Sequence, residues 1–87
     1  MEEIFRALSS NIRLKILEYI GDEARSVSDI VKRFSLTQPT ISHHLKVLKK
    51  VGLIVEKRYK KWIYYRLNHE LFENVRGFLE KLFKKGR

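Results

Sequence analysis

The stretch from Leu36 to Val51 constrains the fold more than any other part of this sequence. It begins like a helix, because Thr37 can cap free backbone N–H groups and Pro39 loses little in the first helical turn. Apolar residues then recur at steps of four, three and three positions, at Ile41, Leu45, Leu48 and Val51. This spacing predicts a helix that packs one face on a hydrophobic core.

The opposite face of this helix is polar and contains no acidic residue, which suits a helix that enters the major groove of DNA. A glutamine can pair with adenine, serine and threonine can bond to several base edges, and a histidine can reach a guanine acceptor or a phosphate. The base-contact candidates are therefore Gln38, Thr40, Ser42 and His43. The alternative is that these are ordinary exposed polar residues of a surface helix.

Three shorter helices are predicted before this stretch. The first covers Glu2 to Leu8, and the second follows the polar residues 9–11 and stops at Gly21. Ser26 and Asp29 have the spacing of a capping box, which opens the third. About three residues join the third helix to the polar-faced one, as in a helix-turn-helix.

The periodicity changes after Gly52. Residues 53–59 and 62–67 are rich in Val, Ile, Tyr and Trp, as expected for two strands of a hairpin that bends at residues 59–61. Asn68 can cap a last helix that carries many apolar positions. The predicted fold is mainly α with a small β-hairpin: four helices, two strands and a final helix. We expect residues 1–87 to form one domain.

Charge is concentrated in the middle of the chain. The formal net charge is +9, and +8 of it lies between residues 26 and 67. Such a concentration fits a polyanionic partner, with nucleic acid first and an anionic membrane second. The alternative is a basic surface that serves solubility, which would spread the charge more evenly.

The order of these elements resembles that of ArsR-type winged helix-turn-helix regulators. The motifs that carry the resemblance span about residues 4–67: the segment 5–17 (FRALSSNIRLKIL), the segment 36–48 (LTQPTISHHLKVL), Gly52-Leu53-Ile54 and the segment 62–67 (WIYYRL). The resemblance implies a homodimer, paired through its first and last helices, that binds operator DNA and often releases it when a ligand binds.

Two sets of residues follow from the charge pattern and the resemblance. Contacts with phosphate or an adjacent minor groove are expected from two places, the predicted helix 38–51 with its cap and the basic wing at residues 57–61. The candidates are Thr37 and Lys46 at the helix, and Lys57, Arg58, Lys60 and Lys61 in the wing. The dimerisation helices would be residues 1–9 and 68–85, with these interface positions: Ile4, Phe5, Leu8, Leu71, Phe72, Val75, Phe78, Leu79, Leu82 and Phe83.

The sequence departs from the family where a metal would bind. It has no cysteine, and the start of the third helix, where metal-sensing members commonly place cysteines, reads Ser26-Val27-Ser28-Asp29. His43 and His44 are adjacent and cannot share a metal on a helix. His44 lies beside the buried stripe, at the histidine position that the resemblance implies, so we expect it to be a hydrogen-bonded structural residue. His69 and Glu73 share a helix face, and two such pairs across a dimer axis could make a four-ligand site. A carboxylate near a helix start also stabilises the helix without a metal. We expect no metal and no cofactor.

The sequence leaves two properties of the hairpin open, the length of its tip and the role of its aromatic residues. The family's wing tip usually contains glycine, but Lys60 stands at that position, which leaves open a longer or looser tip than a two-residue turn. Trp62, Tyr64 and Tyr65 could stack on the bases of single strands, but strand alternation favours packing of some of them against the helices.

The leading hypothesis is a homodimeric repressor that binds double-stranded DNA through helix 38–51 and its basic wing. One alternative is an architectural protein that coats DNA without sequence preference, because counterion release alone provides such affinity. Another is a protein–protein adaptor that docks through its last helix. No nucleophile–base–acid set is visible, so an enzyme is not expected, and no apolar run is long enough to span a membrane. We expect a cytoplasmic, nucleoid-associated protein; the sequence leaves any small-molecule or metal effector unknown.

Overall fold

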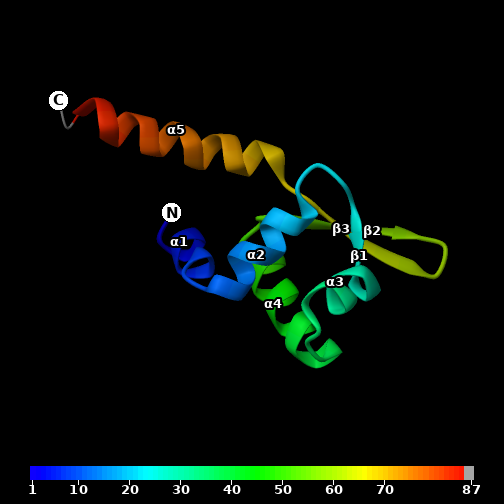
Figure 1. The fold of residues 1–87 in the computed structure, drawn as a ribbon. Helices are drawn as coiled ribbons and strands as arrows, with labels where there is room; N and C mark the ends of the chain where they lie inside the picture. The colour runs from blue at the N-terminus through cyan, green and yellow to red at the C-terminus, as the bar shows by residue number, and fades with distance from the viewer. Residues whose placement is uncertain (86–87) are drawn as a thin grey trace.

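The computed structural model describes residues 1–85 and contains five helices and three strands; residues 86–87 of the predicted domain lie outside the described residues. In chain order the elements are α1 (Glu2–Leu8), α2 (Asn11–Ile20), β1 (Arg25–Ser26), α3 (Val27–Phe34), α4 (Gln38–Lys50), β2 (Ile54–Tyr59), β3 (Trp62–Leu67) and α5 (His69–Lys85). Figure 1 shows α1 to α4 gathered beside a small sheet, with α5 extending away from them. The predicted mainly α fold with a β-hairpin is confirmed.

The helices begin and end at the residues that the sequence indicates. The Ser10 side chain accepts a hydrogen bond from the Arg13 backbone N–H and caps α2, and Gly21 ends it with φ 49°. Ser26 and Asp29 form the predicted capping box at α3, with reciprocal hydrogen bonds of 3.0 and 3.1 Å between side chain and backbone. These bonds satisfy N–H groups that a helix start leaves free.

The turn between α3 and α4 positions the predicted DNA-binding helix. Ser35 ends α3 in the left-handed region with φ 53°, and Thr37 caps α4 by accepting from the Thr40 N–H. The apolar face of α4 is buried, as its spacing predicts, and belongs to a core shared by the helices and the sheet. The members of that core are Ala7, Ile16, Leu17, Ile20, Ile30, Ile41, Leu45, Leu48, Leu53 and Ile54. This packing holds α4 with its polar face outward.

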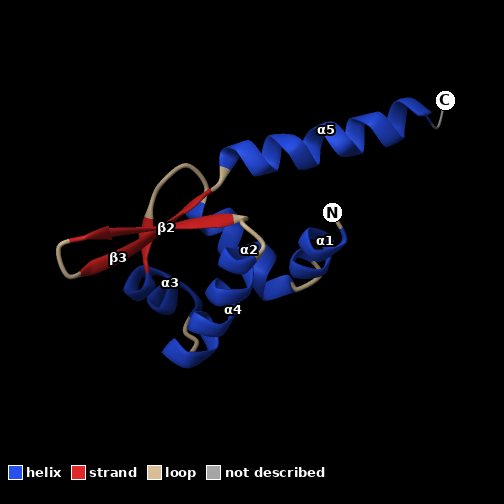
Figure 2. Ribbon diagram, turned by 180° about the vertical axis from the view of Figure 1, so that it is seen from behind, coloured by secondary structure: helices blue, strands red, loops and turns tan. Residues whose placement is uncertain are grey.

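The sheet has a third strand that the sequence analysis did not predict. β1 pairs antiparallel with β3, with Arg25 opposite Tyr65 and Ser26 opposite Tyr64, and β3 lies between β1 and β2. Figure 2 shows the sheet from behind, with its hairpin projecting beyond the helices. A strand of two residues is too short to show alternation, so no periodic signal marks it.

The tip of the hairpin is a two-residue turn, because Tyr59 pairs with Trp62 and leaves only Lys60 and Lys61 between the strands. Lys60 takes a positive φ of 55°. The longer or looser tip that the sequence left open is therefore not found. The lysine adopts the conformation that glycine usually supplies at such a turn.

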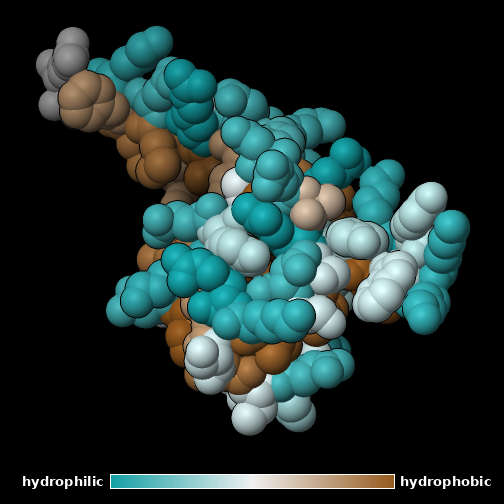
Figure 3. Space-filling model, turned by 45° about the vertical axis from the view of Figure 1, so that its right-hand side comes forward, coloured by the Kyte–Doolittle hydropathy of each residue, from teal (hydrophilic) through white to brown (hydrophobic). Residues whose placement is uncertain are grey.

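Helix α5 is only partly covered by the rest of the chain. Near its start, Asn68 accepts from the Leu71 N–H and donates to the Gly52 carbonyl oxygen, which fixes the helix to the end of α4. Leu71 and Phe72 pack against the core and Val75 is buried, whereas Leu79 and Leu82 are about half exposed. Figure 3 shows apolar surface along one side of this helix.

Candidate nucleic-acid interface

The four predicted base-contact residues are all exposed on the outside of α4, and Lys46 is exposed as well. The capping pair at the start of the helix is ordered, since the Thr37 and Thr40 hydroxyl oxygens lie 2.9 Å apart in a hydrogen bond. The described part of α4 contains no acidic residue. This surface can therefore offer hydrogen-bond donors and acceptors to base edges without repelling phosphates.

Arg13 and His44 form a contact behind that surface that links α2 to α4. The Arg13 Nη1 group donates to His44 Nδ1 at 3.2 Å, and Arg13 Nε donates to the Ala7 carbonyl oxygen at 2.7 Å. Burial, followed by the nearby Arg13 guanidinium and the His43 ring, lowers the pKa of His44 below its ordinary value. His44 is thus the predicted hydrogen-bonded structural histidine.

The predicted wing residues Lys57, Arg58, Lys60 and Lys61 are exposed at the end of the hairpin. Two aromatic side chains accompany them: the Lys60 ammonium lies 5.5 Å from the centre of the Tyr59 ring, and Lys61 lies 5.4 Å from that of Trp62. Such cation–π contacts favour lysine side chains that lie beside the two rings. Trp62 is 47% exposed and Tyr65 is half-buried against the core, so only part of the aromatic set packs inward.

Glu56 connects the wing to α4, a role that sequence reasoning missed. Its carboxylate accepts hydrogen bonds from the Lys49 ammonium and from the Tyr65 hydroxyl, both at 3.1 Å. These two bonds hold the pKa of Glu56 below its ordinary value, and burial together with the Glu56 contact raises that of Tyr65. Glu56 is the only acid in the two hairpin strands, which is the one sequence signal that singles it out.

The predicted dimer residues fall into two groups. Ile4, Leu8, Leu71, Phe72 and Val75 pack within the chain, and the Phe5 and Phe78 rings meet with centroids 6.0 Å apart. Leu79, Leu82 and Phe83 are 49, 51 and 67% exposed. The exposed part of the predicted interface is thus the outer half of α5, with Phe5 beside it.

The two residues considered for a metal on α5, His69 and Glu73, both lie at the protein surface. His69 is exposed, and Glu73 pairs with Arg76 at 3.5 Å. Within residues 1–85, no three His, Cys, Asp or Glu side chains gather in a group that could bind a metal ion. None of the helices in this part of the chain has the length and apolar content needed to cross a bilayer.

Comparison with known proteins gives a consistent set of relatives. Residues 10–56 match the family model for bacterial regulatory proteins of the arsR family. The chain is 33% identical over 86 residues to the transcriptional repressor SdpR of Bacillus subtilis, an alignment that covers 99% of this chain and 96% of SdpR. It is 31% identical to the arsenic resistance regulator ArsR1 of Pseudomonas putida, covering 88% of this chain and 61% of that protein.

Solved structures agree with this result. An ArsR-like transcriptional regulator from Rhodococcus sp. RHA1 is similar with a TM-score of 0.89 and 26% identity, over 97% of this chain and 77% of that one. The homodimeric winged helix-turn-helix DNA-binding domain of Mb0332 from Mycobacterium bovis has a TM-score of 0.79 and 25% identity, over 97% and 78% of the two chains.

Proposed function

Because this chain belongs to the ArsR family of bacterial regulatory proteins, we propose that it is a homodimeric repressor that recognises a specific sequence of double-stranded DNA. The family consists of DNA-binding transcriptional regulators and not of enzymes. Its place of action would be the nucleoid DNA of the cytoplasm.

The observation that carries this proposal is the exposed, acid-free face of α4. In the proposed complex Gln38, Thr40, Ser42 and His43 face base edges in the major groove, and Thr37 and Lys46 contact the flanking phosphates. Their exposure supports these roles, as does the burial of the opposite face of the helix. A helix held on its apolar side presents a fixed pattern of polar groups, which sequence recognition requires.

The wing supplies affinity in this proposal. Lys57, Arg58, Lys60 and Lys61 would touch phosphates or the adjacent minor groove and add no direct sequence information. The Lys49–Glu56 contact supports this role, because it connects the hairpin to α4 and so couples the position of the wing to that of the reading helix.

In this proposal residues 1–87 form a single domain, and two copies of that domain pair through residues 1–9 and 68–85. The exposed apolar half of α5 supports it, as does the homodimeric state of the similar Mb0332 domain. A two-fold dimer would place two copies of α4 in successive major grooves about 34 Å apart, on an inverted-repeat site.

Selection of bound fragments from random double-stranded DNA tests the proposal. We expect enrichment of an inverted repeat with half-sites one helical turn apart, bound about 10³-fold or more tightly than random DNA at physiological salt. Equal affinity for the selected site and for random DNA would instead support a protein that coats DNA without sequence preference. The net charge of +9 favours that alternative, because charge neutralisation alone gives sequence-independent affinity.

A further inference from the structure

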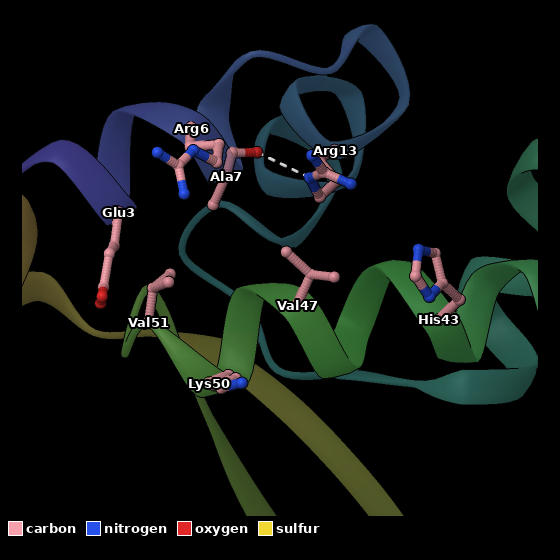
Figure 4. Close-up of a pocket in the computed structure, with 8 residues that line it drawn as sticks. All are labelled: Glu3, Arg6, Ala7, Arg13, His43, Val47, Lys50 and Val51. Carbon is pink, nitrogen blue, oxygen red and sulfur yellow. Dashed lines mark hydrogen bonds between the residues drawn. The ribbon is translucent and has the colours of Figure 1, made fainter.

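A cavity of about 440 Å³ opens between α1, α2 and α4, beside the outer face of α4. Arg6, Arg13 and Lys50 line it with positive charge, and Glu3 is the one acidic lining residue. Figure 4 shows these groups on three helices around one space, with His43 at its end on α4. The excess of positive charge favours an anionic occupant.

Arg13 is held in a fixed orientation at this cavity. Its Nε and Nη1 groups donate to the Ala7 carbonyl oxygen and to His44 Nδ1, and its Nη2 group has no hydrogen-bond partner among residues 1–85. A guanidinium has five N–H donors in a planar fork that matches the oxygens of phosphate. A donor that is already ordered loses little conformational freedom when it binds a ligand.

We propose that this cavity is a binding site for a phosphate-like oxyanion. The Nη2 group of Arg13 donates to the oxyanion. Lys50 adds positive charge beside it, as does Arg6, which also pairs with Glu2 at 2.7 Å. Arg6, Arg13 and Lys50 belong to neither the base-contact nor the wing residues, so this site adds new residues to the DNA contacts proposed above and meets them only at His43.

Two sources could supply the oxyanion. Because His43 and Lys50 are part of α4, the first is a backbone phosphate of bound DNA, and this source rests on the proposed function. The second is a free phosphate ester, since the volume falls in the range of about 300–1,000 Å³ typical of small-molecule sites. Ala7 and Val47 would cover an apolar group of such a molecule. Both sources use the same N–H groups and therefore compete.

The first arm of the test uses the protein without DNA. Inorganic phosphate is titrated at constant ionic strength while NMR follows the Nε–H signal of Arg13, with sodium chloride as the reference salt. We expect a saturable shift of this signal. The K50Q substitution should raise the dissociation constant for phosphate several-fold. K15Q is the matched control, because Lys15 is an exposed lysine of α2 that does not line this cavity.

The second arm measures affinity for a random-sequence duplex against salt concentration, so it does not depend on sequence recognition. Loss of one phosphate contact lowers the slope of log K against log salt by about 0.9. If DNA supplies the oxyanion, K50Q lowers the slope by about this amount per contact and K15Q does not. If a free anion supplies it, the two variants give equal slopes while the phosphate titration stays saturable.

Two results would overturn the proposal. One is a linear drift of the Arg13 signal that sodium chloride reproduces, combined with equal salt slopes for K50Q and K15Q. The other is a saturable shift whose dissociation constant for phosphate is the same in K50Q as in the wild type. Failure to enrich an inverted repeat would count against sequence-specific recognition. Both arms of this test could still be interpreted, because the first uses no DNA and the second uses a random-sequence duplex.

Discussion

Two neighbouring histidines on α4 lie in different environments. His43 is exposed at the predicted DNA surface, whereas His44 is half-buried and accepts from Arg13. Arginine can only donate, so Nδ1 of His44 must be unprotonated in this contact. Adjacent positions on a helix point in different directions, which lets one histidine face solvent and the next face Arg13 of α2.

Replacement of His43 by alanine should reduce sequence discrimination. If the ring contacts a base, H43A weakens binding to the selected site by about 0.5–1.5 kcal/mol, the value of one hydrogen bond, and leaves random-DNA binding nearly unchanged. Competition binding with the two duplexes measures both numbers. H69A is the control, because His69 is exposed near the start of α5. Equal losses on both duplexes would assign His43 to phosphate contact.

His44 should make folding stability depend on pH. Its pKa is lowered in the folded state, so the unfolded chain binds a proton first as the pH falls. The free energy of unfolding should therefore decrease as the pH falls through the ordinary histidine pKa of 6.5. Asp29 and Glu56 also have lowered pKa values, but their stabilisation is lost only below their ordinary values of 3.8 and 4.5.

Urea denaturation at several pH values measures this effect. H44Q should flatten the dependence, because a glutamine oxygen can accept from Arg13 and does not titrate. H69Q serves as the matched control and should retain the slope. An H44Q profile parallel to that of the wild type would show that other groups cause the pH dependence.

Among the elements, the wing is where local strain coincides with proposed function. Lys60 takes a positive φ at the turn, which costs a non-glycine residue about 1–2 kcal/mol. Glycine would remove that cost but lose about 0.5–1 kcal/mol through the greater freedom of the unfolded chain. On the central values glycine would be the more stable residue here, whereas the exposed lysine places a positive charge at the tip, where the proposed phosphate contact needs it.

K60G should consequently stabilise the fold and weaken DNA binding in the same variant. We expect the free energy of unfolding to rise by about 0.75 kcal/mol, the middle of the range of about 0–1.5 kcal/mol that the difference of these two effects spans. The salt slope of DNA binding should fall by about 0.9 per lost contact. K60Q separates the effects, since it removes the charge and keeps the strain. An unchanged salt slope in both variants would remove Lys60 from the proposed DNA surface.

The elements could be predicted where local chemistry fixes them. Thr37, Pro39 and the apolar spacing of α4 define one helix, and the capping box of Ser26 and Asp29 defines another. Contacts between distant segments could not be predicted. The two-residue strand β1 exists only because β3 pairs with it, and the Lys49–Glu56 bond depends on how the hairpin packs on α4. Periodicity records which face of an element is apolar, but not what that face meets.

At the scale of the whole molecule, α5 carries more apolar side chains than the rest of the chain covers. Its first half packs on the core, while Leu79, Leu82 and Phe83 lie on the outer half, where they are about half exposed or more. Small domains bury only about 60% of the surface that their unfolded chains expose, so burial of this helix against a second copy would add stability that one copy lacks. The same contact would fix the spacing of the two α4 helices on DNA.

Substitution of both Leu82 and Phe83 by aspartate should therefore separate the dimer and weaken DNA binding together. Two carboxylates in an apolar contact lose their hydration without gaining partners, whereas both are solvated in a monomer, so the monomer should remain folded. Light scattering should show half the wild-type mass, and affinity for the selected inverted repeat should fall toward that of a single half-site. The control is K81D, because Lys81 is exposed on the polar side of the same helix. An unchanged mass in the double variant would place the dimer contact elsewhere, whereas half the mass with full affinity would show that one copy of α4 suffices for recognition.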